Sequence, residues 1–261
     1  MNKLSLIVPV YNEAWHLKDV VEYFMQSRFP CEVEWLFVDD CSEDASLVIL
    51  KRLSNKFGFR VIESKQNQGK GAAVVRGIQE ASGDIIGIQD ADFEYDVSDL
   101  AKLLRPILEN KADVVYGSRF QPPFSRVPRT FHYFVNRFLT LLSNGCSGLF
   151  LTDMETCYKL FRADLLKSMN LSSRKFGIEV ELTAYLGKTA ARICELPISY
   201  FPRSFVQGKK ITWKDGLAAL FHLIHFNFMV TDQQAFCCLP VRYLRNSCSD
   251  GRFVNKAEQN R

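Results

Sequence analysis

The chain has 261 residues, of which 47% are hydrophobic and 24% are charged, and its formal net charge is +4. This composition excludes a disordered chain and suits one large α/β domain, with or without appendages. No segment interleaves basic and aromatic residues on a recognisable reading element, so we expect no nucleic-acid partner. The cysteines lack the C-x-x-C spacing of zinc sites, and the N-terminal apolar run is too short for a signal peptide. We therefore expect a cytoplasmic protein with reduced thiols.

Short apolar runs alternate with segments of helical period in the first half of the chain. The runs predict strands at residues 4–10, 33–38, 60–63, 85–89 and 112–116. Apolar residues at helical spacing predict helices around residues 17–24, 47–57, 74–78 and 100–108. Asn12 is the expected cap of the first helix, and Pro106 should bend or shorten the last one. This alternation predicts an α/β fold with a mostly parallel central sheet flanked by helices.

The pattern changes after Gly117. It predicts helices at residues 131–143, 174–186 and 212–228 and a strand at 191–201. The longest apolar segment, residues 217–230, is too short to span a bilayer and carries two histidines and an asparagine. We interpret it as a buried or membrane-surface helix. From about Thr231 the periodicity fades, which predicts a polar, poorly structured tail.

Polar residues follow three of the expected strands, at the point where each strand ends. They are Tyr11 to Glu13, Asp39 with Asp40, and Asp90 to Glu94. In an open α/β sheet the ligand crevice lies outside the carboxyl ends of the strands. The sequence therefore predicts a binding site at this edge of the sheet.

The sharpest local motif is Asp90-Ala-Asp92. Two carboxylates spaced by one residue at a strand end suit a hard divalent cation, Mg²⁺ or Mn²⁺, with Glu94 as a further ligand. Such a cation stabilises the two phosphates of a departing nucleoside diphosphate. The alternative is a solvated acidic turn, and the position after a buried strand favours the metal site.

Several motifs occur in order along the chain and together carry a family resemblance. They are residues 7–13 (IVPVYNE), 38–44 (VDDCSED), 67–71 (NQGKG), 89–92 (QDAD), 114–120 (VVYGSRF), 152–159 (TDMETCYK) and 176–181 (FGIEVE). The chain resembles family 2 glycosyltransferases, in the branch of dolichyl-phosphate mannose and glucose synthases and their bacterial relatives. The resemblance covers about Leu4 to Gly216 and implies the GT-A fold. We expect a GT-A catalytic domain at residues 1–211, an amphipathic helix at 212–230 and the tail at 231–261.

The resemblance implies a site for a nucleotide-sugar donor. It assigns six residues to the nucleotide and its surroundings, namely Pro9, Tyr11, Glu13, Asp39, Asp40 and Lys70. A carboxylate is well suited to accept hydrogen bonds from ribose hydroxyls or base nitrogens. The alternative roles are core packing for Tyr11 and the start of a helix for Asp40.

The resemblance also implies an acceptor site with Arg119 and Arg137 as catalytic residues beside Asp92. Guanidinium groups position a phosphate acceptor and balance its charge. Arg137 lies on an otherwise apolar helix, and its alternative role is a surface residue with a buried stem. The sugar and diphosphate end is assigned to Asp153, Glu155 and Lys159, with Lys159 as the expected phosphate contact.

Three further substrate-binding candidates have weaker support. Glu179 near a helix start is commonly structural. Arg203 and Lys209 lie in a basic stretch with Gly208, which is expected either to close over the bound diphosphate or to remain a solvated loop.

The expected reaction is inverting transfer of a hexose from UDP-glucose or GDP-mannose to a polyprenyl (dolichyl or undecaprenyl) phosphate. One alternative is transfer to a hydroxyl of a polysaccharide or glycolipid, which requires a carboxylate base such as Glu155 or Glu179. Another is a non-catalytic nucleotide-sugar-binding module. Unlike many bacterial lipid-carrier relatives, the sequence does not continue into two transmembrane helices. We therefore expect peripheral contact with the cytoplasmic face of a membrane, through the helix at 212–230.

Overall fold

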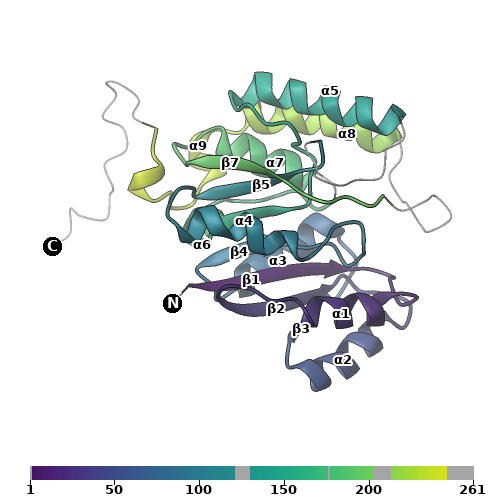
Figure 1. Cartoon of the computed structure of the whole chain (residues 1–261). Coiled ribbons are helices and arrows are strands. Elements are labelled where there is room, and N and C mark those ends of the chain that lie inside the picture. The colour runs from purple at the N-terminus through teal and green to yellow at the C-terminus, as the bar shows by residue number, and fades with distance from the viewer. Residues whose placement is uncertain (1, 121–129, 176, 203–212, 246–261) are drawn as a thin grey trace, which may run out of the picture.

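The structure, a computed structural model, describes residues 2–120, 130–175, 177–202 and 213–245. These residues form one seven-stranded sheet flanked by helices, with the order β3-β2-β1-β4-β6-β5-β7 (Figure 1). The strands are β1 (Lys3–Val10), β2 (Glu32–Asp39), β3 (Arg60–Glu63), β4 (Ile85–Ile88), β5 (Val114–Ser118), β6 (Lys159–Arg162) and β7 (Ile193–Pro197). This architecture confirms the predicted α/β class.

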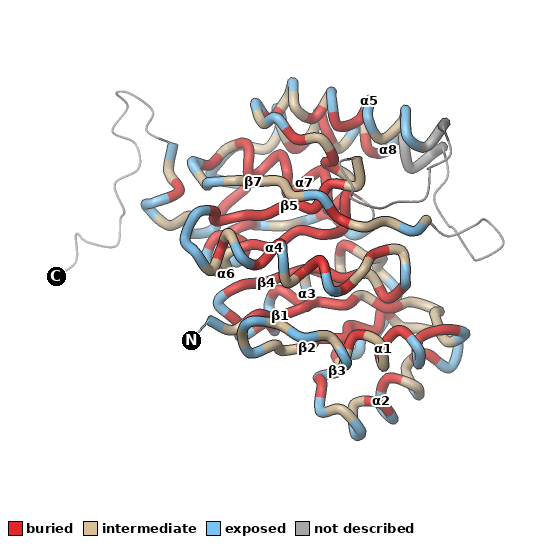
Figure 2. Tube along the Cα trace, viewed as in Figure 1, coloured by how far each residue is buried: buried red, intermediate tan, exposed pale blue. Residues whose placement is uncertain are grey.

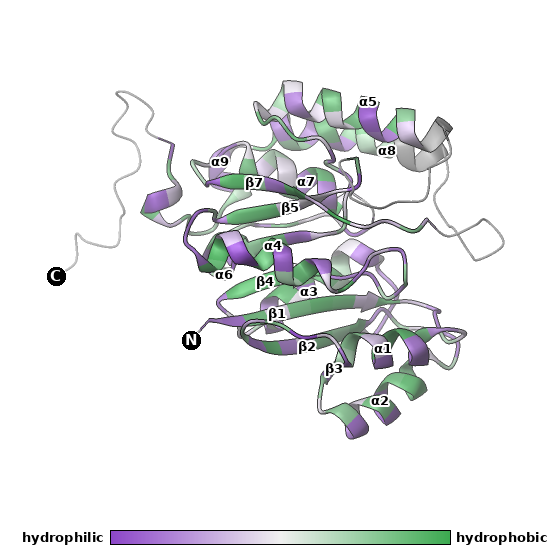
Figure 3. Cartoon of the chain, in the orientation of Figure 1, coloured by the Kyte–Doolittle hydropathy of each residue, from purple (hydrophilic) through white to green (hydrophobic). Residues whose placement is uncertain are grey.

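The strands β3, β2, β1 and β4 form a parallel half of the sheet. Residues 4–8 of β1 and 35–39 of β2 are buried, because helices cover this part of the sheet. Strands buried on both faces need near-continuous apolar runs, which is why the sequence predicted them. Figure 2 shows the buried strands crossing the middle of the molecule, and Figure 3 shows their hydrophobic character.

The sequence pattern did not predict β6, which makes the sheet mixed. It pairs antiparallel with β4 and β5, whereas β5 and β7 pair in parallel. Its four residues begin with Lys159 and end with Arg162, so β6 lacks a long apolar run even though Leu160 and Phe161 are fully buried. The chain then enters the short helix α6 (Ala163–Lys167). The sheet is mostly parallel, as predicted, with one reversed strand inside it.

The helices of the first half occur where the sequence predicted them. They are α1 (Leu17–Met25), α2 (Ser46–Phe57), α3 (Lys70–Glu80) and α4 (Asp99–Leu108). Pro106 lies in the last turn of α4, close to the helix end. The prediction that Asn12 caps α1 is wrong, because His16 is the N-cap and Asn12 has a left-handed φ of 55°. Instead, Asn12 Oδ1 accepts a hydrogen bond from the Glu43 N–H at 2.8 Å and ties two loops together.

The helices α5 (Thr130–Ser147), α7 (Ile178–Leu186) and α8 (Trp213–Ile224) pack together in the second half (Figure 1). Leu139 of α5, Val180 of α7 and Leu223 of α8 share a small core. Every residue of α7 is buried, and α8 continues into a π-helical turn, η2 (His225–Met229). None of the helices in the described ranges is long and apolar enough to cross a membrane.

The segment 231–245 is folded, which corrects the expectation of a poorly structured tail beginning at residue 231. Thr231 and Gln234 form a capping box at the start of α9 (Asp232–Ala235). Phe236 is buried and forms a β-bridge with Met169, and the 3₁₀ turn η3 (Val241–Tyr243) buries Tyr243. Single apolar anchors between turns leave no periodic signal, which explains the wrong prediction. Residues 246–261 lie outside the described residues.

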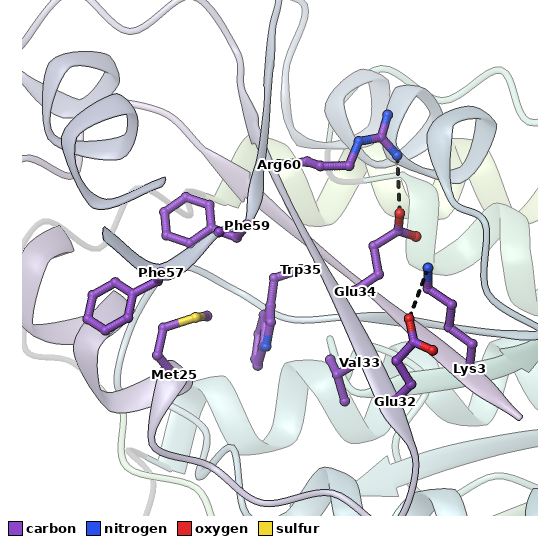
Figure 4. A pocket seen from close by; sticks show the side chains of 10 residues that line it. Lys3, Met25, Glu32, Val33, Glu34, Trp35, Phe57, Phe59 and Arg60 are labelled. Carbon is purple, nitrogen blue, oxygen red and sulfur yellow. Dashed lines mark hydrogen bonds and ion pairs between the residues drawn. The ribbon is translucent and has the colours of Figure 1, made fainter. Parts of the chain in front are cut away.

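A pocket of about 290 Å³ opens at the amino-terminal ends of β1, β2 and β3 (Figure 4). Met25, Trp35, Phe57 and Phe59 give it an apolar floor. Its charged rim is closed by the ion pairs Lys3–Glu32 (3.4 Å) and Arg60–Glu34 (3.2 Å). This pocket lies at the opposite edge of the strands from the polar loops and is separate from the candidate site.

Candidate active site

The carboxyl ends of β1, β2 and β4 bring the polar loops to one edge of the sheet. These strands are parallel neighbours, so the residues that follow them lie side by side. The Asp40 N–H donates to the Val10 carbonyl at 2.9 Å, and the Gln89 N–H donates to the Ile7 carbonyl at 2.9 Å. The pairing therefore continues up to the loops, and the structure brings the three predicted loops together.

The two aspartates that end β2 have different partners. Both carboxylate oxygens of Asp40 accept backbone N–H groups from the turn before α3, including Gly69 at 2.6 Å. Burial raises the pKa of Asp40, against the lowering effect of these hydrogen bonds. Asp39 accepts the Ser42 N–H at Oδ2 (3.1 Å), whereas its Oδ1 is buried and accepts no hydrogen bond from the described residues. Asp40 thus shapes the loop, and Asp39 offers an acceptor to a ligand.

The loop after β1 is fixed by side chains from other loops. The Glu13 N–H donates to Ser46 Oγ at 2.9 Å, and buried His16 lies with Nε2 3.0 Å from the Ala91 carbonyl. His16 therefore links this loop to the Asp90-Ala-Asp92 motif, a role that a lone histidine in a sequence does not reveal. Tyr11 is half-buried, as is Pro9 at the end of β1, so Tyr11 is not part of the core.

The Gly69-Lys70-Gly71 turn allows another loop to approach the start of α3 very closely. A Cβ on Gly69 would lie 2.6 Å from the Arg174 carbonyl oxygen, and one on Gly71 would lie 2.3 Å from that of Ser173. Gly69 also has a φ of +96°, which other residues rarely adopt. Fully buried Glu181 holds the approaching loop by accepting the Ser173 N–H at 2.8 Å. Glu181 is therefore a positioning residue at the site.

Lys70 lies between carboxylates from two different elements. Its Nζ is 2.8 Å from Asp90 Oδ1 and 3.1 Å from Glu179 Oε1. Burial alone would lower the pKa of Lys70, but these carboxylates hold it well above its ordinary value. Glu179 Oε2 is buried and accepts no hydrogen bond within the described part of the chain. The structure therefore joins α3, the acidic motif and α7 through one partly buried cation.

The acidic motif turns sharply after β4. Asp92 is buried, and its Oδ1 accepts the Glu94 N–H at 2.8 Å, while Asp90 remains partly exposed. The turn directs Glu94 to the Tyr200 hydroxyl, which donates to its Oε2 at 3.2 Å. Among the described residues no three His, Cys, Asp or Glu side chains form a metal-binding group, so Glu94 as a further ligand stays a prediction that its substitution tests. Asp90 and Asp92 still offer oxygen donors of the kind that Mg²⁺ combines with substrate phosphates.

Arg119, which follows β5, is held by Asp153. Its Nε and Nη2 donate to the two carboxylate oxygens, each at 2.7 Å, and its backbone N–H donates to Oδ2 at 3.0 Å. Burial would lower the pKa of Arg119, but the Asp153 charge holds it well above its usual range. Asp153 is fully buried and orients Arg119, and its predicted position at the sugar end stays a prediction.

Arg137 of α5 shares an aromatic neighbour with Arg119. Its Nη1 donates to the Thr152 carbonyl at 3.1 Å, and its guanidinium is 5.7 Å from the centre of the Phe120 ring. The Arg119 guanidinium is 5.8 Å from the same ring and 5.3 Å from the Tyr200 ring. Two guanidinium groups therefore converge on Phe120, and Tyr200 connects this cluster to Glu94. Sequence analysis did not identify Phe120 or Tyr200 as site residues, since aromatics near strand ends are common.

Three ionisable residues cluster beneath this edge. Lys159 is fully buried on β6 and donates to the carbonyls of Met154, at 2.9 Å, and Thr156. Burial lowers the pKa of Lys159, and burial together with the charge of Glu179 raises that of Glu155 to about 7. Lys159 therefore braces the loop before β6, and its role as a phosphate contact stays a prediction. Arg203 and Lys209 lie outside the described residues.

The sequence matches the family model described as "Glycosyl transferase family 2" over residues 5–169, more than half of its length. The chain belongs to glycosyl transferase family 2. The match includes the loops after β1, β2, β4 and β5, so the family region carries the polar edge of the sheet.

Curated relatives of this family 2 chain include lipid-phosphate sugar transferases. A "Dolichol-phosphate mannosyltransferase" of Pyrococcus furiosus is 34% identical over 118 residues, which are 45% of this chain and 33% of that protein. A "UDP-N-acetylglucosamine--dolichyl-phosphate N-acetylglucosaminyltransferase" of Methanococcus voltae is 28% identical over 80% of this chain and 90% of that protein. An "Undecaprenyl-phosphate mannosyltransferase" of Micrococcus luteus is 28% identical over 79% and 87%. The chain thus spans about a third of the first relative and most of the other two.

Solved structures show the same fold. Glucosyl-3-phosphoglycerate synthase from Mycobacterium tuberculosis, in complex with Mn²⁺, UDP and glucosyl-3-phosphoglycerate, has a TM-score of 0.66 at 18% identity, over 87% of this chain and 80% of that one. TarS 1–349 of S. aureus, in complex with UDP-GlcNAc, has a TM-score of 0.58 at 22% identity, over 88% and 68%. These similarities confirm the GT-A fold of this family 2 member.

Proposed function

We propose that the chain is an inverting glycosyltransferase that transfers a hexose from a nucleotide-sugar to the phosphate of a polyprenyl phosphate. The observation that carries the proposal is the pair of guanidinium groups converging on Phe120, on the same sheet edge as Asp90 and Asp92. The names of the Pyrococcus, Methanococcus and Micrococcus relatives support a lipid-phosphate acceptor. UDP-glucose and GDP-mannose are the leading donors.

The nucleotide of the donor binds at the ends of β1 and β2 in this proposal. The buried Asp39 Oδ1 accepts a hydrogen bond from the base or ribose, which supplies the partner that the described chain does not. Tyr11, Pro9 and Glu13 contact the same nucleotide. Lys70 contacts the diphosphate, and Asp40 acts through the turn that it anchors.

Asp90 and Asp92 would hold a divalent cation, Mg²⁺ or Mn²⁺, through their carboxylate oxygens. The solved structure with Mn²⁺ and UDP supports such a site. When bound, the cation would supply positive charge that stabilises the leaving diphosphate. Lys70, which pairs with Asp90 in the ligand-free chain, would supply a second positive charge for a phosphate oxygen of the donor.

The acceptor phosphate is already anionic near neutral pH, so its reaction requires positioning and charge balance more than a strong base. Arg119 is suited to this role because Asp153 fixes its guanidinium plane through Nε and Nη2. The remaining N–H groups of the guanidinium can then donate to a phosphate. Arg137 supplies the second positive charge. The phosphate oxygen attacks the anomeric carbon as the bond to the diphosphate breaks, in a single displacement.

A hydroxyl acceptor is the second candidate, and one observation favours it. The pKa of Glu155 is raised to about 7 by burial and by the charge of Glu179, which suits a general base near neutral pH. Replacing Glu155 by Gln separates the two reactions, since a hydroxyl acceptor needs the base and a phosphate acceptor does not.

The test is sugar transfer from UDP-glucose and from GDP-mannose, with Mg²⁺, to a short polyprenyl phosphate, beside a reaction without acceptor. Acceptor-dependent formation of a lipid-phosphate sugar is the expected result. Donor binding without transfer to this acceptor would contradict the proposal, leaving a hydroxyl acceptor or a non-catalytic binding role.

We place the catalytic unit at residues 1–211 and its action at the cytoplasmic face of a membrane.

A further inference from the structure

Large hydrophobic side chains are exposed along one side of the second half of the molecule. Within the described residues they come from α5, from the loop after it, and from α8 with η2. They are Phe134, Phe138, Leu141, Phe150, Phe221, Ile224, Phe228 and Met229, and we call them the α5–α8 face. Other exposed large hydrophobic residues, such as Trp15, Val48 and Val241, are scattered over distant elements. Scattered examples are normal on protein surfaces, whereas a gathered set indicates an interaction site.

The residues of this face share one side of each helix. On α5, Phe134, Phe138 and Leu141 recur at helical spacing, while Leu139 and Ser143 on the opposite side are buried. On α8 and η2, the exposed residues likewise lie opposite buried ones such as Leu223 and Phe226. Figure 1 shows α5 and α8 side by side as an outer layer, and Figure 2 shows exposed positions along it. The two exposed sides therefore form one outward-facing surface.

The sequence around these helices is basic and poor in acids. Residues 114–152 contain four arginines and no Asp or Glu, and of these Arg137 is exposed on α5. Residues 196–231 contain four basic residues against a single acid, Asp215, although most of these basic residues lie outside the described residues. Apolar and aromatic side chains combined with cations, and almost without acids, are typical of a helix that lies in a membrane interface.

We infer that the α5–α8 face docks the protein on an anionic lipid surface, with α5 and α8 lying in the plane of the interface. A second copy of the chain fits less well. A twofold contact would bring the Arg137-bearing α5 helices of two copies together, and the sequence of α5 has no acid to neutralise them. Anionic headgroups neutralise the same cations, while the phenylalanines bury their rings at the level of the acyl chains.

Docking by this face also connects to the acceptor site, a step that rests on the proposed function. Arg137 belongs to α5, and its guanidinium reaches from that helix to the Thr152 carbonyl and the Phe120 ring. Arg119 flanks the same ring. A lipid phosphate at the interface therefore meets Arg137 first and Arg119 next, without leaving the membrane surface.

The test is co-flotation of the full-length chain with vesicles of equal parts phosphatidylcholine and phosphatidylglycerol, and with pure phosphatidylcholine vesicles. We expect binding to the anionic vesicles. Each of F138S, L141S and F228S should weaken that binding about tenfold, because each removes one apolar side chain that would be buried in the membrane. The triple variant combines the three substitutions. The matched control is V48S, which changes an exposed apolar residue on α2. Equal binding of wild type and the triple variant would overturn the inference, as would a stable dimer in solution that the triple variant abolishes.

Failure of docking is separable from failure of the proposed function. Transfer to a short, water-soluble polyprenyl phosphate does not need the vesicle, so the triple variant should retain wild-type turnover with it and lose turnover with a long-chain acceptor in vesicles. If the wild type binds vesicles but transfers no sugar to either acceptor, docking stands and the proposed reaction fails. If it transfers sugar to the short acceptor but does not bind vesicles, the docking inference is wrong and the reaction stands.

Discussion

The two halves of the sheet hold their charged residues in different ways. In the half formed by β3, β2, β1 and β4, β1 and β4 have apolar buried stretches, and the carboxylates of the candidate site lie at or beyond the strand ends. In the half formed by β6, β5 and β7, charges are fully buried inside the scaffold, as Asp153, Lys159 and Glu181 show. The first arrangement presents charge to a ligand, and the second uses charge to fix the groups that contact one.

The largest expected effect comes from the charge presented by the first half. Asp92→Asn should reduce sugar transfer about a hundredfold or more, because it removes an anionic ligand for the cation that stabilises the leaving diphosphate. The fold should be unaffected, since the amide oxygen of Asn can still accept the Glu94 N–H. Initial rates at saturating donor, together with a urea denaturation curve, test both statements.

The matched control is Glu94→Gln, two residues away. Its carboxylate pairs with the Tyr200 hydroxyl and belongs to no three-membered metal-binding group in the described chain. We expect its Mg²⁺ requirement to match that of the wild type. A hundredfold loss in both variants would show that Glu94 is a metal ligand, as the sequence predicted, and would refute the distinction drawn between these two acids.

In the second half, the largest expected effect is on stability. Arg119→Ala leaves the fully buried Asp153 carboxylate without its ion pair, which should lower the free energy of unfolding by about 3–5 kcal/mol. The exposed pair Arg105–Glu109 provides the control, and Arg105→Ala should change stability little. Equal effects of the two substitutions in urea denaturation would mean that Asp153 is not the buried anchor of Arg119.

Arg119→Lys separates positioning from charge. It keeps a positive charge beside Asp153 but cannot form the two parallel hydrogen bonds. We expect the KM for the acceptor to rise while that for the donor stays unchanged. A parallel rise in both would contradict the assignment of Arg119 to the acceptor.

The contrast between the halves explains which strands and site residues could be predicted from the sequence. β1, β2 and β4 were predicted because buried parallel strands need continuous apolar runs, and the polar loops followed from where those runs end. β6 was missed because it begins with Lys159. A lysine in a buried strand can be understood only once the carbonyls that accept its hydrogen bonds are known. Asp153 and Lys159 were recognised as members of the site region, but their partners depend on contacts between distant segments. His16 and Tyr200 belong to no motif, and Phe120 ends the 114–120 motif without a role that the sequence alone assigns to it.

The pH dependence of stability should expose the buried charge of the second half. Because burial raises the pKa of Glu155 from 4.5 to about 7, the folded chain keeps a proton that the unfolded chain releases over this range. Stability contributed by this group therefore falls as the pH rises from about 4.5 to about 7, by about 3 kcal/mol at most. Glu155→Gln, neutral in both states, should remove that fall. Parallel stability curves for wild type and variant across this range would show that Glu155 titrates normally.

The smallest expected effect lies where the two halves touch. A Cβ on Gly71 would lie 2.3 Å from the Ser173 carbonyl oxygen and 2.8 Å from that of Lys175, so Gly71→Ala must displace the loop that Glu181 holds. We expect a loss of about 1–3 kcal/mol in stability and weaker donor binding.

Gly145→Ala makes the same chemical change inside α5, where a Cβ meets nothing within 4 Å, and should stabilise the chain by about 0.5–1 kcal/mol. Donor titration by calorimetry should then show weaker binding for Gly71→Ala alone. If both variants bind donor as the wild type does, the close approach of the two halves contributes to folding but not to the nucleotide site.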